Sequence, residues 1–247
     1  MMTIENYVRA ESLEQAWQLN QKRRNRILGG MLWQRLGNGS ISTAIDLSGL
    51  GLDTIEETED RFILGAMVTL RQLELHENLG KYTQNAVKNA VKDIVGVQFR
   101  NMATVGGSIW GRFGFSDVLT VLLSMDCEVS LYKAGRMPLE AFAKMPPDRD
   151  ILTHIIVKKT PGKFVYTAMR NQRTDLPVLT CAMSKIGGET RTVIGARPGR
   201  AMVFRNKTPG ELAQIVPTGS NNRGSSQYRS HLVKVLAERN MQELEAL

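Results

Sequence analysis

The sequence predicts an α+β protein built as two lobes. Short apolar stretches typical of strands are interspersed with helical segments, without the strict strand–helix–strand rhythm of a parallel α/β fold. The charge changes abruptly near the polar stretch Lys158–Lys163: residues 1–157 carry 17 Lys and Arg against 18 Asp and Glu, whereas residues 158–247 carry 15 against 6. The net charges of the two parts are therefore −1 and +9, which indicates a boundary near residues 158–165.

Local signals predict the first elements. Ser12-Leu13-Glu14-Gln15 is a capping-box pattern, in which Ser12 bonds the third helical amide and Gln15 reaches back, and it predicts a helix that ends near residues 22–25. Arg26–Leu28 is a short apolar stretch that runs into Gly29-Gly30, as a strand opening onto a turn does. Further segments in this part are strands at 44–47 and 61–66 and helical spacing of apolar residues over 81–95.

The rest of the chain is less regular. Residues 99–115 are rich in glycine and in Thr, Ser and Asn, and they show little periodicity. Asp117 then introduces an apolar helix near its cap, and Pro146-Pro147-Asp148 interrupts the chain later. The other expected elements are strands at 127–132 and 155–157, a hairpin of 178–186 and 191–196 joined by Gly187-Gly188, and a helix at 225–247.

Composition excludes several classes of protein. The 247 residues are 42% hydrophobic and 23% charged, which is typical of a globular protein, and no apolar run approaches the roughly 18 residues of a membrane span. The first residues lack the basic and apolar regions of a signal peptide, and Cys127 and Cys181 lie in apolar contexts, which favours a reduced, cytoplasmic setting. The basic residues are spaced singly with few aromatics among them, so nucleic acid is not the expected partner. A docking face for an acidic partner and a solvated basic surface both remain open for the +9 part.

The chain offers little catalytic chemistry of its own. The histidines at 76, 154 and 231 are isolated, with no Cys, Asp or Glu at metal-ligand spacing, so no metal site is expected. A nucleophile elbow and a P-loop are both absent, and Gly37-Asn38-Gly39 lacks the rest of a dinucleotide fingerprint. No catalytic residue is therefore expected, and a bound cofactor is the source of chemistry that the sequence leaves room for.

Two glycine-rich segments are candidates for holding a cofactor. After the strand at 26–28, the amides of Gly30, Met31 and Leu32 are placed to face a phosphate oxygen, although an ordinary Gly-Gly turn explains the same residues. Ala103–Ile109 is the stronger signal, because Thr104 and Ser108 place hydroxyls beside close-approach glycines and Asp117 adds an acceptor downstream. That set suits a polyol and diphosphate ligand, with structural loop glycines as the alternative.

At these residues the sequence resembles the FAD-binding subunit of the molybdenum hydroxylases, the family of xanthine dehydrogenase and carbon monoxide dehydrogenase. Phe99–Ile109 matches the family segment Arg-Asn-x-Ala-Thr-x-Gly-Gly-Asn-Ile, and Asp117 falls where the family has an Asp before a Leu-rich helix. Other matching segments follow in the family's order, at Gly29-Gly30, 44–47, 63–69, 194–201 and 227–232.

The resemblance implies a fold and a set of partners. It implies an FAD-binding domain of the vanillyl-alcohol-oxidase (PCMH) type, in two α+β subdomains over residues 1–160, followed by a smaller α+β C-terminal flavoprotein domain over 161–247. It also implies non-covalent FAD on this chain, with molybdopterin on a large partner subunit and two [2Fe–2S] clusters on a small one. Electrons from a substrate such as a purine or another N-heterocycle would pass through iron–sulfur to FAD and then to NAD or another acceptor.

By position, the resemblance also assigns cofactor-binding residues. Leu28–Leu32 would line the diphosphate, Asp117 would accept from a cofactor hydroxyl, and Arg170 or Arg173 would stand where many members have a Lys near the flavin. The residues expected around the cofactor are Leu28, Gly29, Gly30, Met31, Leu32, Ala103, Thr104, Gly106, Gly107, Ser108, Ile109, Asp117 and Arg170.

The sequence departs from the family at three of these places. Where the family reads Ala-Gly-Gly-Thr-Asp-Leu, this chain has Leu28–Trp33, so a hydroxyl and an acid are missing, and Ser108 replaces the family's Asn. Backbone contacts survive these changes, so weakened FAD binding is expected. Trp33 is compatible with packing on the cofactor and equally with a place in the core. The alternative function is a non-catalytic scaffold that keeps the fold without FAD.

Overall fold

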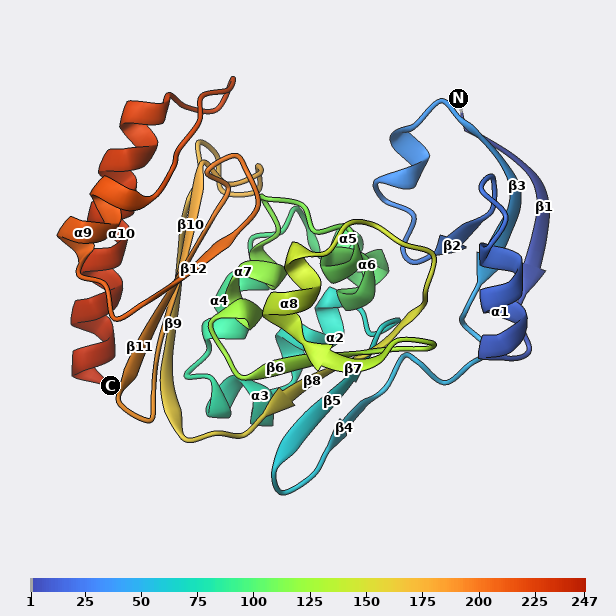
Figure 1. Cartoon of the computed structure of the whole chain (residues 1–247), viewed down its shortest axis with the longest axis horizontal. Coiled ribbons are helices and arrows are strands. Elements are labelled where there is room, and N and C mark those ends of the chain that lie inside the picture. Colours follow the sequence, from blue (N-terminus) through green and yellow to red (C-terminus); the bar gives the residue numbers. More distant parts are fainter. Residues whose placement is uncertain (1) are drawn as a thin grey trace.

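The chain forms three β-sheets in a row, with helices packed beside and between them (Figure 1). The computed structural model describes residues 2–247. The two ends of the chain lie at opposite ends of the molecule, with the N-terminal sheet on the right of Figure 1 and the C-terminal helices on the left. Within residues 2–247, no helix has the length and apolar character needed to cross a membrane.

The first sheet is small and parallel. Its strands are β1 (Thr3–Arg9), β3 (Ser40–Asp46) and β2 (Arg26–Leu28), in that order, with α1 (Leu13–Asn20) and the short 3₁₀ helix η1 (Gln34–Leu36) beside them. Ser12 caps α1 by accepting from the amide of Gln15, as predicted, but the Gln15 side chain accepts from Glu11 rather than from the cap residue. The helix also ends at Asn20, earlier than its pattern predicted.

The second sheet is five-stranded and antiparallel. Its order is β4 (Ile55–Glu57), β5 (Arg61–Gly65), β8 (Leu152–Lys158), β6 (Cys127–Leu131) and β7 (Gly135–Pro138). Seven short helices connect these strands: α2 (Leu70–Leu75), α3 (Glu77–Tyr82), α4 (Ala86–Val91), α5 (Val97–Met102), α6 (Val105–Trp110), α7 (Asp117–Leu123) and α8 (Leu139–Lys144). The helix α7 is buried at every position and lies in the centre of the molecule (Figure 1).

The third sheet is antiparallel in the order β12 (Met202–Arg205), β11 (Glu189–Gly195), β10 (Leu179–Ile186) and β9 (Gly162–Met169). Helices α9 (Pro209–Ile215) and α10 (Ser226–Ala246) cover one of its faces (Figure 1). The other face packs on α4 and α7, so Phe164, Ala182 and Val193 belong to the same apolar core as Leu122. Only residues 159–161 separate β8 from β9, and the largest apolar core contains side chains from both the second and the third sheet.

The α+β class and most of the predicted strands are confirmed, and two segments differ from expectation. The helical pattern over 81–95 is divided, because Gln84 and Asn85 adopt left-handed backbone conformations (φ of 47° and 64°) between α3 and α4. The segment 99–115, which shows little periodicity, contains most of α5 and all of α6. The prediction that Asp117 lies near the cap of an apolar helix is confirmed: Asp117 is the first residue of α7, and Ser116 caps the helix by accepting from the amide of Leu119.

Candidate functional site

A cavity of about 800 Å³ opens between the first sheet and the helices of the second. This volume lies within the range of roughly 300–1,000 Å³ that small-molecule sites occupy. Its walls come mainly from six parts of the chain: the residues around β2, the segment from Ile94 to Phe99, the α6 region, the start of α7, and two later segments at 147–152 and 174–176.

The cavity brings together most of the residues that the sequence singled out. Those on its walls are Leu28, Gly29, Gly30, Met31, Leu32, Ala103, Thr104, Gly106, Gly107, Ser108 and Asp117. Ile109 and Arg170 are placed elsewhere. Ile109 is on the inward face of α6 and is fully buried in the main core, and Arg170 lies behind Asp117, to which it is bonded.

The glycine loop after β2 has unused hydrogen-bond donors. Within residues 2–247, the amides from Gly29 to Trp33 have no acceptor in the protein, and all five residues line the cavity. Leu32 is buried, the three residues before it are half-buried, and Trp33 is exposed. Backbone amides that are withdrawn from bulk water usually have a partner, so this run of free donors on a cavity wall is suited to a ligand or to ordered water. This geometry fits the diphosphate of a dinucleotide, since backbone amides bind phosphate oxygens without needing a particular side chain.

Glycine is required in this loop by its neighbours. A Cβ on Gly30 would lie 1.9 Å from the carbonyl oxygen of Met102, and one on Gly29 would lie 2.9 Å from Thr104 Oγ1. The two glycines therefore let the loop lie directly against the turn between α5 and α6. That contact sets the first sheet against the α6 wall of the cavity.

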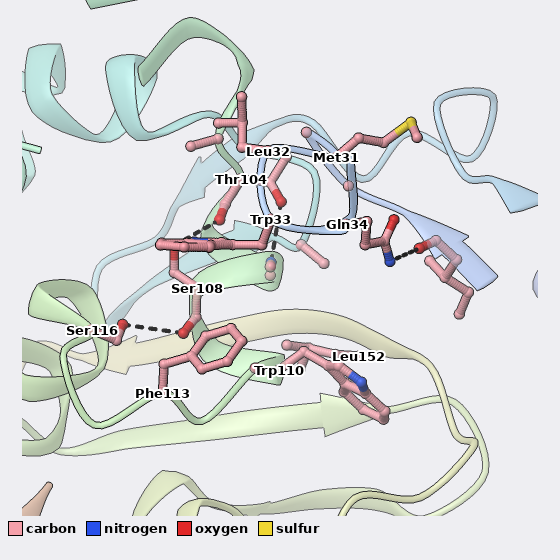
Figure 2. Close-up of a pocket in the computed structure, with 18 of the residues that line it drawn as sticks. Met31, Leu32, Trp33, Gln34, Thr104, Ser108, Trp110, Phe113, Ser116 and Leu152 are labelled. Atoms are coloured by element: carbon pink, nitrogen blue, oxygen red, sulfur yellow. Dashed lines mark hydrogen bonds between the residues drawn. The ribbon is translucent and has the colours of Figure 1, made fainter. Parts of the chain in front are cut away.

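The backbone amides at the start of α6 already have acceptors within the protein. The amides of Val105 and Gly106 donate to the carbonyls of Val68 and Ala66, and the amides of Gly107 and Ser108 donate to Thr104 (Figure 2). A Cβ on Gly106 would lie 2.5 Å from the Ala66 oxygen, so this glycine serves close packing. The α6 segment shapes the cavity wall, and the free donors are on the β2 loop.

Asp117 joins the cavity to the third sheet. Its Oδ1 accepts from Arg170 Nη2 at 2.5 Å and from the hydroxyl of Tyr166, and the Asp117 and Arg170 side chains are only 6% and 9% exposed. Burial raises the pKa of Asp117 to about 6 in spite of the neighbouring Arg170. Burial, followed by the charge of Asp117, raises the pKa of Tyr166 well above its usual value.

The basic side chains on the cavity wall are engaged with the turn between α1 and β2. Arg149 donates to the carbonyls of Asn20, Lys22 and Arg23 at 2.8–3.1 Å, and Arg26 donates to two carbonyls of the same turn. The charges of both side chains remain beside the cavity. Because these guanidinium groups already donate to backbone carbonyls, the free amides remain the more available donors for a ligand. Arg173 is 82% exposed, is paired with Asp93 and does not line the cavity.

Part of the wall could not be found from sequence. Thr174, Asp175 and Leu176 reach the cavity from beyond residue 160, and residues 147–152 reach it from the segment that leads into β8, the central strand of the second sheet. Neither segment carries a recognisable motif. Phe113 and Phe115 lie between two segments that were singled out, and their aromatic character is the signal that was missed. Within residues 2–247 there is no group of three or more His, Cys, Asp or Glu placed to hold a metal ion.

Comparisons with known proteins identify a family and several relatives. Residues 2–160 match the family described as the FAD binding domain in molybdopterin dehydrogenase. YgfM of Escherichia coli (strain K12) is 27% identical, and the match covers 94% of this chain and 93% of that protein. The glyceraldehyde dehydrogenase medium chain of Sulfolobus acidocaldarius is also 27% identical, over 97% of this chain and 98% of its own length.

Solved structures share the fold over the whole chain. A chain of the CO dehydrogenase from Oligotropha carboxidovorans superposes with a TM-score of 0.83 at 18% identity, covering 99% of this chain and 98% of that one. A chain of quinoline 2-oxidoreductase from Pseudomonas putida 86 gives 0.83 at 16% identity, covering 97% and 96%. The expected fold class, a two-subdomain domain followed by a smaller α+β part, is confirmed.

Proposed function

The chain belongs to the family of FAD-binding domains of molybdopterin dehydrogenases, and from this premise we propose that it is the FAD-binding, electron-transferring subunit of a multi-subunit oxidoreductase. The run of free amides from Gly29 to Trp33 on the cavity wall carries this proposal. When bound, FAD supplies the redox chemistry at its isoalloxazine ring, which none of the side chains in the cavity can provide.

The residues of the chain have separate tasks in this proposal. The loop from Gly29 to Trp33 binds the diphosphate through its amides, and Thr104 keeps α6 in place beside it by accepting from the amide of Gly107. Asp117, on the cavity wall, is the acceptor for a cofactor hydroxyl. Arg170 orients that carboxylate from behind and is a positioning residue.

The finer parts of the proposal concern partners and boundaries. Related proteins are named as a glyceraldehyde dehydrogenase medium chain, a CO dehydrogenase and a quinoline 2-oxidoreductase, and these act on unrelated molecules. The substrate is therefore selected by another subunit. We assign molybdopterin to a large partner and [2Fe–2S] clusters to a small one, with NAD or another acceptor receiving the electrons. The division into residues 1–160 and 161–247 belongs to the same proposal, supported by the family match to 2–160.

The proposal is tested by flavin retention. The purified chain is mixed with FAD and washed free of unbound cofactor. Its absorption spectrum is then examined for the flavin bands at about 375 nm and 450 nm. Retained bands in the wild type are expected, with strong loss in Gly29→Ala, whose added Cβ would lie 2.9 Å from Thr104 Oγ1. Gly39→Ala is the matched control, because a Cβ there meets nothing within 4 Å.

Two outcomes contradict the proposal. A wild-type chain that stays colourless with FAD in large excess, alone and with its partner subunits, favours the scaffold alternative. Equal retention by the Gly29 and Gly39 variants, with both folded, shows that the β2 loop is not the binding element.

A further inference from the structure

Three aromatic side chains meet across the cavity from two separate walls. Trp33 follows the glycine loop, whereas Phe113 and Phe115 belong to the segment between α6 and α7. The ring centroid of Trp33 is 6.0 Å from that of Phe113 and 5.3 Å from that of Phe115, and the two Phe rings are stacked at 5.1 Å. Figure 2 shows Trp33 and Phe113 beside Ser108 and Ser116 on the cavity wall.

These rings are not part of a closed core. Trp33 is 46% exposed and Phe113 is 41% exposed, although both are in contact with other aromatic rings. Large aromatic side chains left accessible inside a cavity are typical of a surface that receives another flat, apolar group. The structure thereby decides against a core role for Trp33.

The position of the three rings relative to the free amides indicates which part of a ligand would contact them. Trp33 is the last residue of the loop whose amides are unpaired, and Phe115 precedes Ser116 and the cavity-lining Asp117. If the amides bind the phosphates of a ligand, the part of the ligand attached to those phosphates therefore lies beside the rings. Faces of Trp and Phe attract planar heteroaromatic rings, because stacking gains both apolar contact and favourable electrostatics.

We propose that Trp33, Phe113 and Phe115 form a stacking site for one planar ring system of the bound dinucleotide, and that Trp33 provides the larger share of the contact. This inference rests on the proposed function and deepens it, since it places a ring-binding subsite next to the diphosphate loop. The stacking contact compensates for the hydroxyl and the acid that the loop lacks at Met31 and Leu32.

The experiment measures FAD affinity in the full-length chain by titration, in four variants besides the wild type. In Trp33→Leu the Kd for FAD is expected to rise about tenfold, as for loss of one stacked ring. Trp33→Phe restores a ring and is expected to stay within about threefold of the wild type. Phe113→Leu provides a second, independent reading and should weaken binding about fivefold. Leu36→Ala is the control, because Leu36 is 68% exposed on the neighbouring η1 and does not line the cavity.

Two further probes identify the ring that stacks. If it is the isoalloxazine, Trp33→Leu weakens FMN as much as FAD, leaves ADP unchanged and increases the fluorescence of the bound flavin. If it is adenine, ADP is weakened instead and the flavin fluorescence does not change. Either pattern supports the stacking site.

The two proposals can fail separately. Wild-type binding of FAD together with unchanged affinity in folded Trp33→Leu and Phe113→Leu overturns the stacking site and leaves the proposed function standing. Equal weakening in Trp33→Leu and Trp33→Phe also overturns it, because a ring would then not be what matters. A wild-type chain that does not bind FAD at all overturns both.

Discussion

Removing Arg170 should destabilise the protein strongly at alkaline pH and much less at acidic pH. Arg170 Nη2 lies 2.5 Å from Asp117 Oδ1, and the two side chains are 9% and 6% exposed, so Arg170→Met leaves a carboxylate buried without its counter-ion. The loss of one partner of a buried pair costs about 3–5 kcal/mol of the free energy of unfolding. That is a large share of the roughly 5–15 kcal/mol that stabilises a typical protein.

The pH dependence follows from the pKa of Asp117, which is about 6 in the folded chain against 3.8 in the unfolded one. Because the folded state holds this proton more tightly, the group's contribution falls as the pH rises from about 4 to about 6, by about 3 kcal/mol for two pKa units. Without the Arg170 charge, which lowers this pKa, the folded value moves further upwards. The carboxyl of the variant is then neutral at pH 5, and most of the mutational cost disappears there.

The assay is urea unfolding of the wild type, Arg170→Met and the double variant Asp117→Asn/Arg170→Met at pH 5 and pH 8. The double variant should recover part of the stability lost at pH 8, because no unpaired charge remains. A loss below about 1 kcal/mol for Arg170→Met at pH 8, or the same loss at both pH values, refutes the reasoning.

Substitutions at three further places test other features. Gly106→Ala should lower the free energy of unfolding, measured in urea, by about 1–3 kcal/mol, because its Cβ would lie 2.5 Å from the Ala66 oxygen. Gly210→Ala, in open space on α9, should instead raise it by up to about 1 kcal/mol. Equal effects would contradict the packing role of Gly106. Thr208→Ala removes the capping box of α9 and should lower stability by about 1 kcal/mol, with Thr208→Ser restoring most of it. Arg173→Ala should leave both thermal stability and FAD affinity unchanged, since the side chain is 82% exposed and outside the cavity; a clear drop in FAD affinity would place Arg173 in the site.

Elements with strong local signals were predictable. The hairpin of β10 and β11 was placed correctly because Gly187 and Gly188, with φ of 56° and 86°, are suited to the left-handed turn that such hairpins need. The last helix was found through its apolar spacing and begins after Ser225, whose side chain caps it. In both cases the determining information lies within a few residues of the element.

Elements that depend on distant contacts were not predictable. Strand β1 pairs in parallel with β3, more than thirty residues away, and most of its residues are exposed, so it shows no apolar alternation. The break between α3 and α4 is produced by two left-handed residues, Gln84 and Asn85, and neither is a glycine that would announce it. Helix α6 contains Gly106 and Gly107, which lower helix propensity, and its position depends on close contact with Ala66.

The cavity likewise has parts that the sequence predicted from local signals and parts that depend on distant contacts. The loop at Gly29-Gly30 was identified as a phosphate-binding candidate because the glycines follow a strand, and the cavity lies there. The sequence could not show that the amides of Gly106 and Gly107 are already hydrogen-bonded, because their acceptors, Ala66 and Thr104, are identified only in the fold. The walls at 147–152 and 174–176 are brought to the cavity by long-range packing, which no local pattern encodes.

The third sheet has apolar cores on both of its faces, and this limits where the chain can be divided into fragments or fused to parts of related proteins. Along β10, Cys181 and Met183 face the core under α10, whereas Ala182 belongs to the core it shares with α7. A fragment ending near residue 160 would therefore expose the apolar side of α7, and the remaining fragment would lose the support of one sheet face. A chimera that exchanges the C-terminal part with that of a relative is therefore expected to fold only if this buried contact surface is preserved.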